Sequence, residues 1–284
     1  MRSWTLIALT TAFVLGAPPG WTQDYQISWS SIDSGGGTQT GGAIRLDSSI
    51  GQAVAGYAEG SGRRHWIGFW HPATGVTPEM LPRLDAAKTL PDGRYVGIAG
   101  KIATSGTPDF GGFFYLEEAD RSSGIRISVP FWPVPGLMEG SIVQVTGVTG
   151  TTPDGERQIV ASYVIVTSSA PPLAPLGMIQ RAIGGGDFGT PPLGQYGVTG
   201  GTGVNTIGLL IRAWGTVTET GTGYVMLDDG SGRPLRVDTS TLPVPPATGS
   251  FVTITGISSL KQAGSPPQRL PLLLPRRGSD VNTP

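Results

Sequence analysis

Two stretches of the sequence, 112–129 and 223–239, alternate apolar residues with aromatic and basic ones. The two-residue period of a β-strand puts these two kinds of side chain on opposite faces. If the apolar residues fill an interior, the outward residues are Lys101, Phe113, Tyr115 and Arg126 around the first stretch, and Arg212, Trp214, Tyr224, Met226 and Arg236 around the second. Bases of single-stranded nucleic acid stack on aromatic rings, and arginine binds phosphate, so these residues are candidate ligand contacts.

The same outward faces have a second interpretation. Aromatic side chains on a sheet also stabilise neighbouring strands, and a whole face can pack against another part of the chain. The formal net charge of −1 provides no long-range attraction for polyanions. Glycan and protein therefore stay open as alternative ligands of these faces.

Residues suited to catalysis or metal binding are scarce. His65 and His71 are the only histidines and cysteine is absent, so an ordinary zinc site lacks its usual ligands. No G-x-S-x-G pattern marks a serine nucleophile. We therefore expect a protein that is not an enzyme and that uses no metal and no cofactor.

Two motif-like patterns are better explained by turns and connections. The glycines of GGGDFG (184–189) formally match a dinucleotide-binding fingerprint, but two prolines follow and no strand–helix–strand unit surrounds them. The acidic pairs at 117–118 and 228–229 offer oxygen ligands for calcium, but neither is part of a loop with the terminal Glu of a calcium-binding hand. Asp and Gly also favour hairpin turns, which is the interpretation we prefer.

The candidate residues belong to a sequence that repeats. The segment GSIVQVTGV (140–148) matches GSFVTITGI (249–257), and the two acidic pairs coincide when the hairpin stretches are aligned. The anchoring matches are Leu116 with Leu227, Gly100 with Gly215, and Gly147 with Gly256. We therefore expect two superposable modules, with a β-bulge at Gly100 that lets the first strand curl.

Short alternating runs, together with 45 Gly and 25 Pro, predict an all-β protein with many turns. Each module orders its elements as a long bent strand, a hairpin, a loop and further strand sequence. This order resembles the oligonucleotide/oligosaccharide-binding (OB) fold. The runs AKTLPDGRYVGIAGKI and GFFYLEE…GIRISV are similar to the tRNA-anticodon-type OB domains of exported bacterial proteins. The resemblance implies two tandem five-stranded OB-like barrels with a nucleic-acid-binding face.

The N-terminus predicts export. Arg2 precedes an apolar run from Trp4 to Leu15, which is the layout of a secretory signal peptide and is too short to span a bilayer. Three strand-like runs follow at 25–32, 43–50 and 65–71, the first two separated by glycine clusters. The letters SWSSID, IGQ and GFW in this region resemble the glycine-rich SWSTIDGGGG-type segment of bacterial surface and exported proteins. We expect a secreted, periplasmic or cell-surface protein with no integral membrane span after signal removal.

The expected domain organisation follows from these assignments. It comprises a signal peptide (1–23), a Gly-rich β segment (24–72), a linker (73–83), OB-like domain 1 (84–167), a linker with a short helix (168–207), OB-like domain 2 (208–278) and a tail (279–284).

Charge differs between the two modules. Residues 84–167 contain six Lys and Arg against nine Asp and Glu, whereas residues 208–284 contain seven against five. Because carboxylates repel phosphate, a polyanion should prefer the second module. We therefore expect an exported, non-enzymatic protein whose second OB-like face binds single-stranded nucleic acid. The alternative is a cell-envelope or surface protein, structural or adhesive, whose barrels bind glycan or protein.

Overall fold

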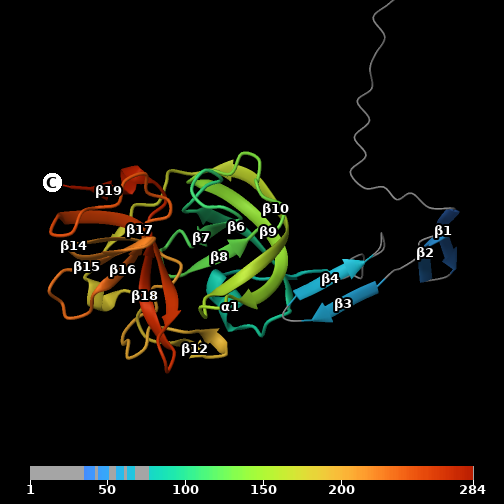
Figure 1. The fold of residues 1–284 in the computed structure, drawn as a ribbon. Coiled ribbons are helices and arrows are strands. Elements are labelled where there is room, and N and C mark those ends of the chain that lie inside the picture. The colour runs from blue at the N-terminus through green and yellow to red at the C-terminus, as the bar shows by residue number, and fades with distance from the viewer. Residues whose placement is uncertain (1–34, 42–43, 51–55, 61–62, 68–76, 284) are drawn as a thin grey trace, which may run out of the picture. The chain divides into compact units, whose positions relative to one another are not determined.

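The chain forms two units, Met1–Gly75 and Val76–Pro284, in a computed structural model that describes residues 35–41, 44–50, 56–60, 63–67 and 77–283 (Figure 1). The first unit contains two antiparallel hairpins: β1 (Gly35–Gly41) with β2 (Ile44–Ile50), and β3 (Gly56–Gly60) with β4 (Arg63–Ile67). The strand predicted at 43–50 is confirmed as β2. The glycine triplet expected to separate strands instead begins β1, because strand pairing uses backbone groups that glycine also has. The predicted signal peptide and the run at 25–32 lie outside the described residues.

Five strands of the second unit close into a barrel. They are β6 (Tyr95–Ala103), β7 (Phe113–Glu117), β8 (Gly124–Ser128), β9 (Ser141–Thr151) and β10 (Arg157–Ser169). Around the barrel the order is β6-β7-β8-β10-β9, with β8 and β10 parallel and β9 pairing back to β6. The short strand β5 (Glu79–Met80) adds to β6, and helix α1 (Leu84–Thr89) precedes the barrel. This closed arrangement is compatible with an OB-like fold.

A second sheet repeats this strand order and is ring-shaped in part. Its strands are β14 (Leu210–Gly221), β15 (Tyr224–Asp228), β16 (Leu235–Asp238), β17 (Phe251–Ala263) and β18 (Gln268–Leu274). β17 pairs back to β14, while the parallel strands β16 and β18 pair at two positions, against three for β8 and β10. β11 (Leu176–Gly177) and β19 (Val281–Asn282) extend the sheet beside β14 and β17. The all-β expectation is confirmed, with one closed barrel and a second, barrel-like sheet.

The register of strand pairing is the same in both barrels up to the aligned glycines and within the hairpins, but it differs by one position after Gly100, because Gly100 is unpaired whereas Gly215 pairs with Val252. The matching pairs are Val96–Gly147 with Ile211–Gly256, and Leu116–Ile125 with Leu227–Leu235. The aligned glycines therefore lie on equivalent strands, as predicted. A register shift between Ala99 and Lys101 confirms the bulge at Gly100, whose φ of 72° suits glycine.

The structural repeat begins further upstream than the sequence indicates. β5 and β11 occupy the same place beside the first strand of each barrel, and each is followed by a short helix, α1 or the 3₁₀ helix η1 (Gln180–Ala182). The first N–H of each helix donates to an aligned carboxylate: Leu84 to Glu118 at 2.7 Å, and Gln180 to Asp229 at 2.8 Å. Part of the expected linker 168–207 thus belongs to the second sheet. The hairpin of β12 (Phe188–Thr190) and β13 (Leu193–Gln195) follows within the same segment.

Each barrel has its own apolar interior. The alternation predicted from sequence is confirmed, because the inward residues are almost completely buried: Phe114, Leu116, Ile125 and Ile127 in the first, and Val225, Leu227, Leu235 and Val237 in the second. The helices of the described residues are short, and none has the length and apolar character needed to cross a membrane.

The outward face of the first barrel packs against the second barrel. Phe110 and Tyr115 form an apolar cluster with Leu210 and Ile257 of the second barrel. The two backbones meet at Gly124 and Gly208, where a Cβ atom on either residue would overlap the carbonyl group of the other. This close approach requires glycine at both positions.

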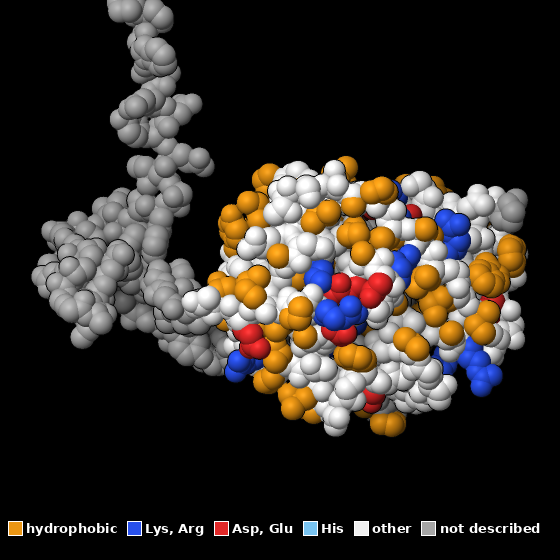
Figure 2. Space-filling model, turned by 180° about the vertical axis from the view of Figure 1, so that it is seen from behind, with side chains coloured by type: hydrophobic (Ala, Val, Ile, Leu, Met, Phe, Trp, Pro, Cys, Tyr) orange, Lys and Arg blue, Asp and Glu red, His pale blue; other side chains and the backbone are white. Residues whose placement is uncertain are grey.

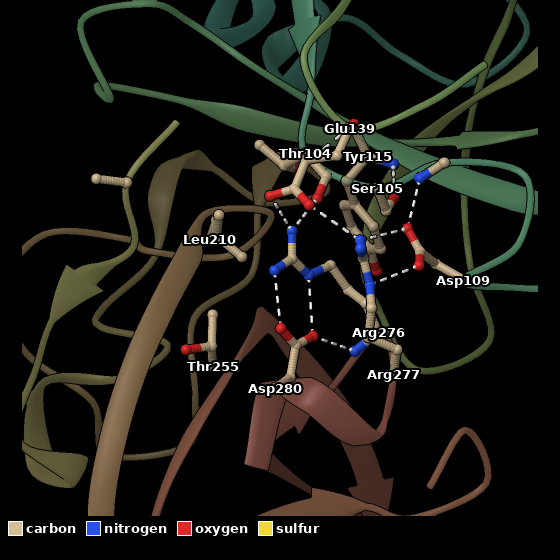
Figure 3. Close-up of polar contacts among 12 residues, drawn as sticks. Thr104, Ser105, Asp109, Tyr115, Glu139, Leu210, Thr255, Arg276, Arg277 and Asp280 are labelled. Carbon is tan, nitrogen blue, oxygen red and sulfur yellow. Dashed lines mark hydrogen bonds and ion pairs between the residues drawn. The ribbon is translucent and has the colours of Figure 1, made fainter. Parts of the chain in front are cut away.

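Ion pairs join the barrels at the C-terminal end of β18 (Figure 3). Arg276 donates to the carbonyl oxygen of Thr104 at 2.8 Å and to Glu139 at 2.5 Å, and Arg277 donates to Glu139 at 2.9 Å. Asp280 binds the opposite edge of the Arg276 guanidinium, which is buried. The bidentate pair with Asp280 lies within the second module and orients the Arg276 guanidinium. The contacts with Thr104 and Glu139 then join the two barrels.

A buried lysine also bridges the barrels. Lys88 of α1 is 3% exposed, and its Nζ donates to the carbonyl oxygen of Ile207 at 2.7 Å. Burial lowers the pKa of Lys88 to about 8, although the negative charges of Glu156, Asp85 and Glu117 oppose this shift. The charged form is therefore penalised in the folded state.

Replacing Gly124 with alanine should weaken the contact between the barrels. The added Cβ meets backbone atoms that cannot rotate away, so we expect the free energy of unfolding to fall by about 1–3 kcal/mol. Urea denaturation followed by tryptophan fluorescence measures this change. Gly111→Ala is the matched control, because a Cβ at Gly111 meets no atom within 4 Å. Equal effects of the two substitutions would contradict the close contact.

Lys88 should make stability rise with pH above its folded pKa of about 8. Between this value and the unfolded lysine pKa of about 10.4, the unfolded state binds more protons than the folded state, so stability increases with pH. From pH 8 to pH 10 the expected gain is about 2 kcal/mol, measured by urea denaturation of the wild type relative to Lys88→Met. Parallel pH profiles of the two proteins would show that Lys88 carries no such penalty.

Candidate functional site

An arginine lies over an aromatic ring at equivalent positions on the two barrels. The guanidinium carbon of Arg236 is 3.6 Å from the ring centroid of Tyr224, and that of Arg126 is 3.5 Å from the ring centroid of Phe113. In each barrel the ring and the arginine come from adjacent antiparallel strands and share the outward face. The sequence predicted this outward placement, and the structure adds that each ring and arginine stack on one another.

A groove on the second barrel lies beside the Tyr224–Arg236 stack. It has a volume of about 260 Å³, and its walls include Met226, Arg233, Arg236, Arg269, Leu270 and Pro271. We call this surface the arginine groove. None of its three arginines forms an ion pair with a carboxylate of the described residues. The groove thus combines apolar walls with three guanidinium groups whose charges have no direct counter-charge in the described part of the chain.

Neighbouring groups hold these arginines and the ring in place. Arg269 stacks on Tyr196 at 4.2 Å from the ring centroid, and Arg233 donates to the carbonyl oxygen of Gly200 at 2.9 Å. The Tyr224 hydroxyl donates to Glu219 at 2.6 Å, and this hydrogen bond raises the pKa of Tyr224 by favouring the protonated phenol. Tyr224 therefore stays neutral, with its ring orientation restrained.

Two predicted contact residues of the first barrel are unavailable to a ligand. Tyr115 points away from the barrel interior, as predicted, but it is completely buried, and its hydroxyl donates to Glu156 at 3.0 Å. Lys101 is also buried, and its Nζ donates to Glu118 at 2.9 Å and to the carbonyl oxygen of Pro82 at 2.7 Å. The expectation that both are exposed is wrong, because strand alternation gives the face of a side chain but not what covers that face.

Arg212 and Trp214 lie apart from the arginine groove. They belong to the part of β14 that pairs with β17, whereas β15 joins β14 only from Thr216 onward. Arg212 is exposed and its Nε donates to Thr255 at 3.1 Å, while Trp214 is half-buried beside Gly177 of β11. The structure does not bring these two residues together with Tyr224 and Arg236.

The positive balance of the second module is partly neutralised by the first. Lys261 pairs with Asp154 at 3.3 Å, and Arg277 pairs with Asp109 at 3.0 Å, in addition to the contacts with Glu139. Figure 2 shows one face of the molecule, on which basic and acidic side chains lie next to each other in a central group. Net charge per module therefore overstates the charge that the second barrel presents to a ligand.

The acidic pair of the first hairpin binds backbone. Glu117 accepts a hydrogen bond from the N–H of Leu210 at 2.9 Å, and Arg121, which pairs with Glu117, donates to the carbonyl oxygen of Leu210 at 2.8 Å. Burial raises the pKa of Glu117, and these donors oppose that shift. Among the described residues, no cluster of three or more His, Cys, Asp or Glu side chains has the arrangement of a metal site.

Sequence reasoning missed Tyr196, Arg233 and Arg269. Tyr196 lies in the segment assigned to a linker, and Arg269 is the second residue of β18, whose sequence departs from the repeat. Arg233 lies in the turn between β15 and β16. Two features of the sequence could have indicated the arginine groove. They are Arg269 near the start of an apolar strand, and Arg233 in the hairpin turn that follows the strand of the outward Tyr224.

Comparison with known proteins found no matching family model and no matching curated sequence.

Proposed function

We propose that the protein is an exported, non-enzymatic binding protein whose second barrel binds single-stranded nucleic acid in the arginine groove. The observation that carries the proposal is the set of three arginines without ion-pair partners among the described residues, next to the Tyr224–Arg236 stack. Export is supported by the N-terminal sequence pattern alone.

The chemistry of the groove suits a flexible polyanion with flat bases. A guanidinium group offers both a planar surface for stacking and several N–H donors for phosphate oxygens. The stack of Arg236 on Tyr224 leaves N–H groups at its edge, while Met226 and Leu270 provide apolar contact for base faces. Such a combination is tolerant of sequence, because every base has a π face.

A specific surface of the first barrel favours the second candidate, a structural or adhesive role with a protein partner. Val160, Tyr163 and Ile165 of β10 are 37%, 53% and 40% exposed. They share the outward face, because the register shift between Ala161 and Tyr163 leaves Ser162 unpaired and brings Tyr163 onto the same face as Val160. Rows of exposed apolar side chains on a sheet are typical of surfaces that bind other proteins.

Arg236→Ala should weaken binding of a labelled mixed-sequence oligonucleotide in fluorescence anisotropy titrations. Because one phosphate contact is lost, the slope of log affinity against log salt should decrease by about one unit. Arg94→Ala is the matched control: Arg94 is an exposed arginine on the first barrel that pairs with Glu79. Equal salt slopes for Arg236→Ala and the wild type would exclude the arginine groove as a phosphate site.

Tyr224→Phe and Tyr224→Ala separate stacking from hydrogen bonding. Removal of the ring should cost about 1–3 kcal/mol of oligonucleotide binding, whereas loss of the hydroxyl alone should cost much less, because the hydroxyl is bound to Glu219. The same anisotropy titrations measure both. If oligosaccharides or a protein partner bind instead, with no dependence on Tyr224, the second candidate is correct.

A further inference from the structure

A second pocket lies between the two barrels, at the other arginine–aromatic stack. It has a volume of about 310 Å³, and its walls include Phe113, Arg126, Glu156 and Gln158 of the first barrel with Leu260 and Leu272 of the second. We call it the inter-barrel pocket. The pocket exists only because the two barrels are held together. Its polar side chains, such as Glu156 and Gln158, take no part in the arginine groove.

Glu156 supplies the pocket with a buried acceptor. The residue is 3% exposed, and its Oε2 accepts hydrogen bonds from Tyr115 at 3.0 Å and Ser259 at 2.8 Å. Its Oε1 is buried and receives no hydrogen bond from any described residue. Burial raises the pKa of Glu156, whereas the charge of Arg126 and the donors Ser259 and Tyr115 oppose this rise. A buried carboxylate oxygen without a donor is unfavourable, so a ligand N–H or O–H that reaches it would be bound selectively.

The stacking surface of the pocket favours a planar ligand over a sugar. Phe113 is stacked with Phe110 at a centroid distance of 4.9 Å and an interplanar angle of 11°, and the Arg126 guanidinium lies over it at 3.5 Å. Two stacked partners occupy the two faces of one ring, so Phe113 has no face left for the C–H groups of a sugar. The guanidinium plane of Arg126 is the remaining stacking surface, and unpaired bases stack on such planes.

The inter-barrel pocket and the arginine groove have no lining residue in common, but β18 contributes neighbouring residues to both. Arg236, in the groove, pairs across β16 and β18 with Leu272, which lines the pocket. Leu270 lines the groove and lies two residues before Leu272, on the same face of the strand. We therefore expect a single strand bound in the groove to extend along β18 to the pocket.

We propose that the inter-barrel pocket receives one base of the bound strand and that Glu156 Oε1 accepts a hydrogen bond from its exocyclic amino group. This inference rests on the proposed function and gives it a base preference. Cytosine, adenine and guanine carry an exocyclic amino group, whereas thymine presents a carbonyl oxygen at the corresponding position. The arginine groove supplies sequence-tolerant affinity, and the pocket selects against thymine.

The test compares oligo(dC) with oligo(dT) of equal length, and deoxycytidine with deoxythymidine monophosphate, in titrations of the full chain. The wild type should bind the cytosine ligands about tenfold more tightly. In Glu156→Gln the amide oxygen should keep the bonds from Tyr115 and Ser259. Its NH₂ group would then take the position of Oε1 and donate to a thymine carbonyl, so the preference should reverse. Glu79 is an exposed carboxylate on β5, and Glu79→Gln is the control that should leave the affinities for cytosine and thymine ligands unchanged.

The outcomes separate this inference from the proposed function. Equal affinity of the wild type for oligo(dC) and oligo(dT) would overturn the base pocket and leave the arginine groove intact. Binding of deoxycytidine monophosphate without binding of any oligonucleotide would support the pocket and refute the proposed function. Binding of none of these ligands would overturn both. If Glu156→Gln fails to fold, the relative affinity of the wild type for cytosine and thymine ligands still tests the base pocket.

Discussion

Burial of charged groups between the two barrels is the constraint on which the second unit depends. Glu117, Glu156 and Lys88 are all buried at this contact, where an unpaired charge is costly. Each therefore needs a partner from the other barrel, and each has one: the N–H of Leu210, the hydroxyl of Ser259 and the carbonyl oxygen of Ile207. Because these partners are backbone groups or short side chains, they tolerate little displacement. The relative position of the barrels is thus specified by hydrogen-bond geometry as well as by apolar packing.

This contact gives two similar barrels different surfaces. Both carry an arginine over an aromatic ring on the same outward face, with almost the same separation. On the first barrel, the neighbouring Tyr115 is buried by the second barrel, and the stack becomes one wall of the inter-barrel pocket. On the second barrel the equivalent position is Met226, which is only half-buried and lines the arginine groove. The same stack therefore lies beside a groove formed by the second barrel and its flanking loops in one case, and beside a pocket shared by both barrels in the other.

The distribution of charge follows from the same contact. Acidic residues of the first barrel pair with Arg276, Arg277 and Lys261 of the second. Much of the negative excess of the first module and of the positive excess of the second is therefore neutralised at their junction. The arginines of the groove stay outside this pairing. Ion pairs that are partly buried are screened less by salt than exposed ones, so the junction should persist at ionic strengths that weaken phosphate binding in the groove.

Local pattern in the sequence determined the all-β class, the equivalence of the two modules, the inward residues such as Phe114 and Val225, and the bulge at Gly100. These features depend on alternation, turn residues and backbone freedom, all of which are encoded within a few positions of one another. Tertiary structure alone decided that Tyr115 and Lys101 are buried, that Arg269 lines the groove while stacked on Tyr196, and that Glu156 lines a pocket. Strand alternation states which way a side chain points, but the surface that meets it comes from residues about 100 positions away, as Ser259 does for Glu156. The physical reason is that packing between barrels joins residues whose separation along the chain carries no periodic signal.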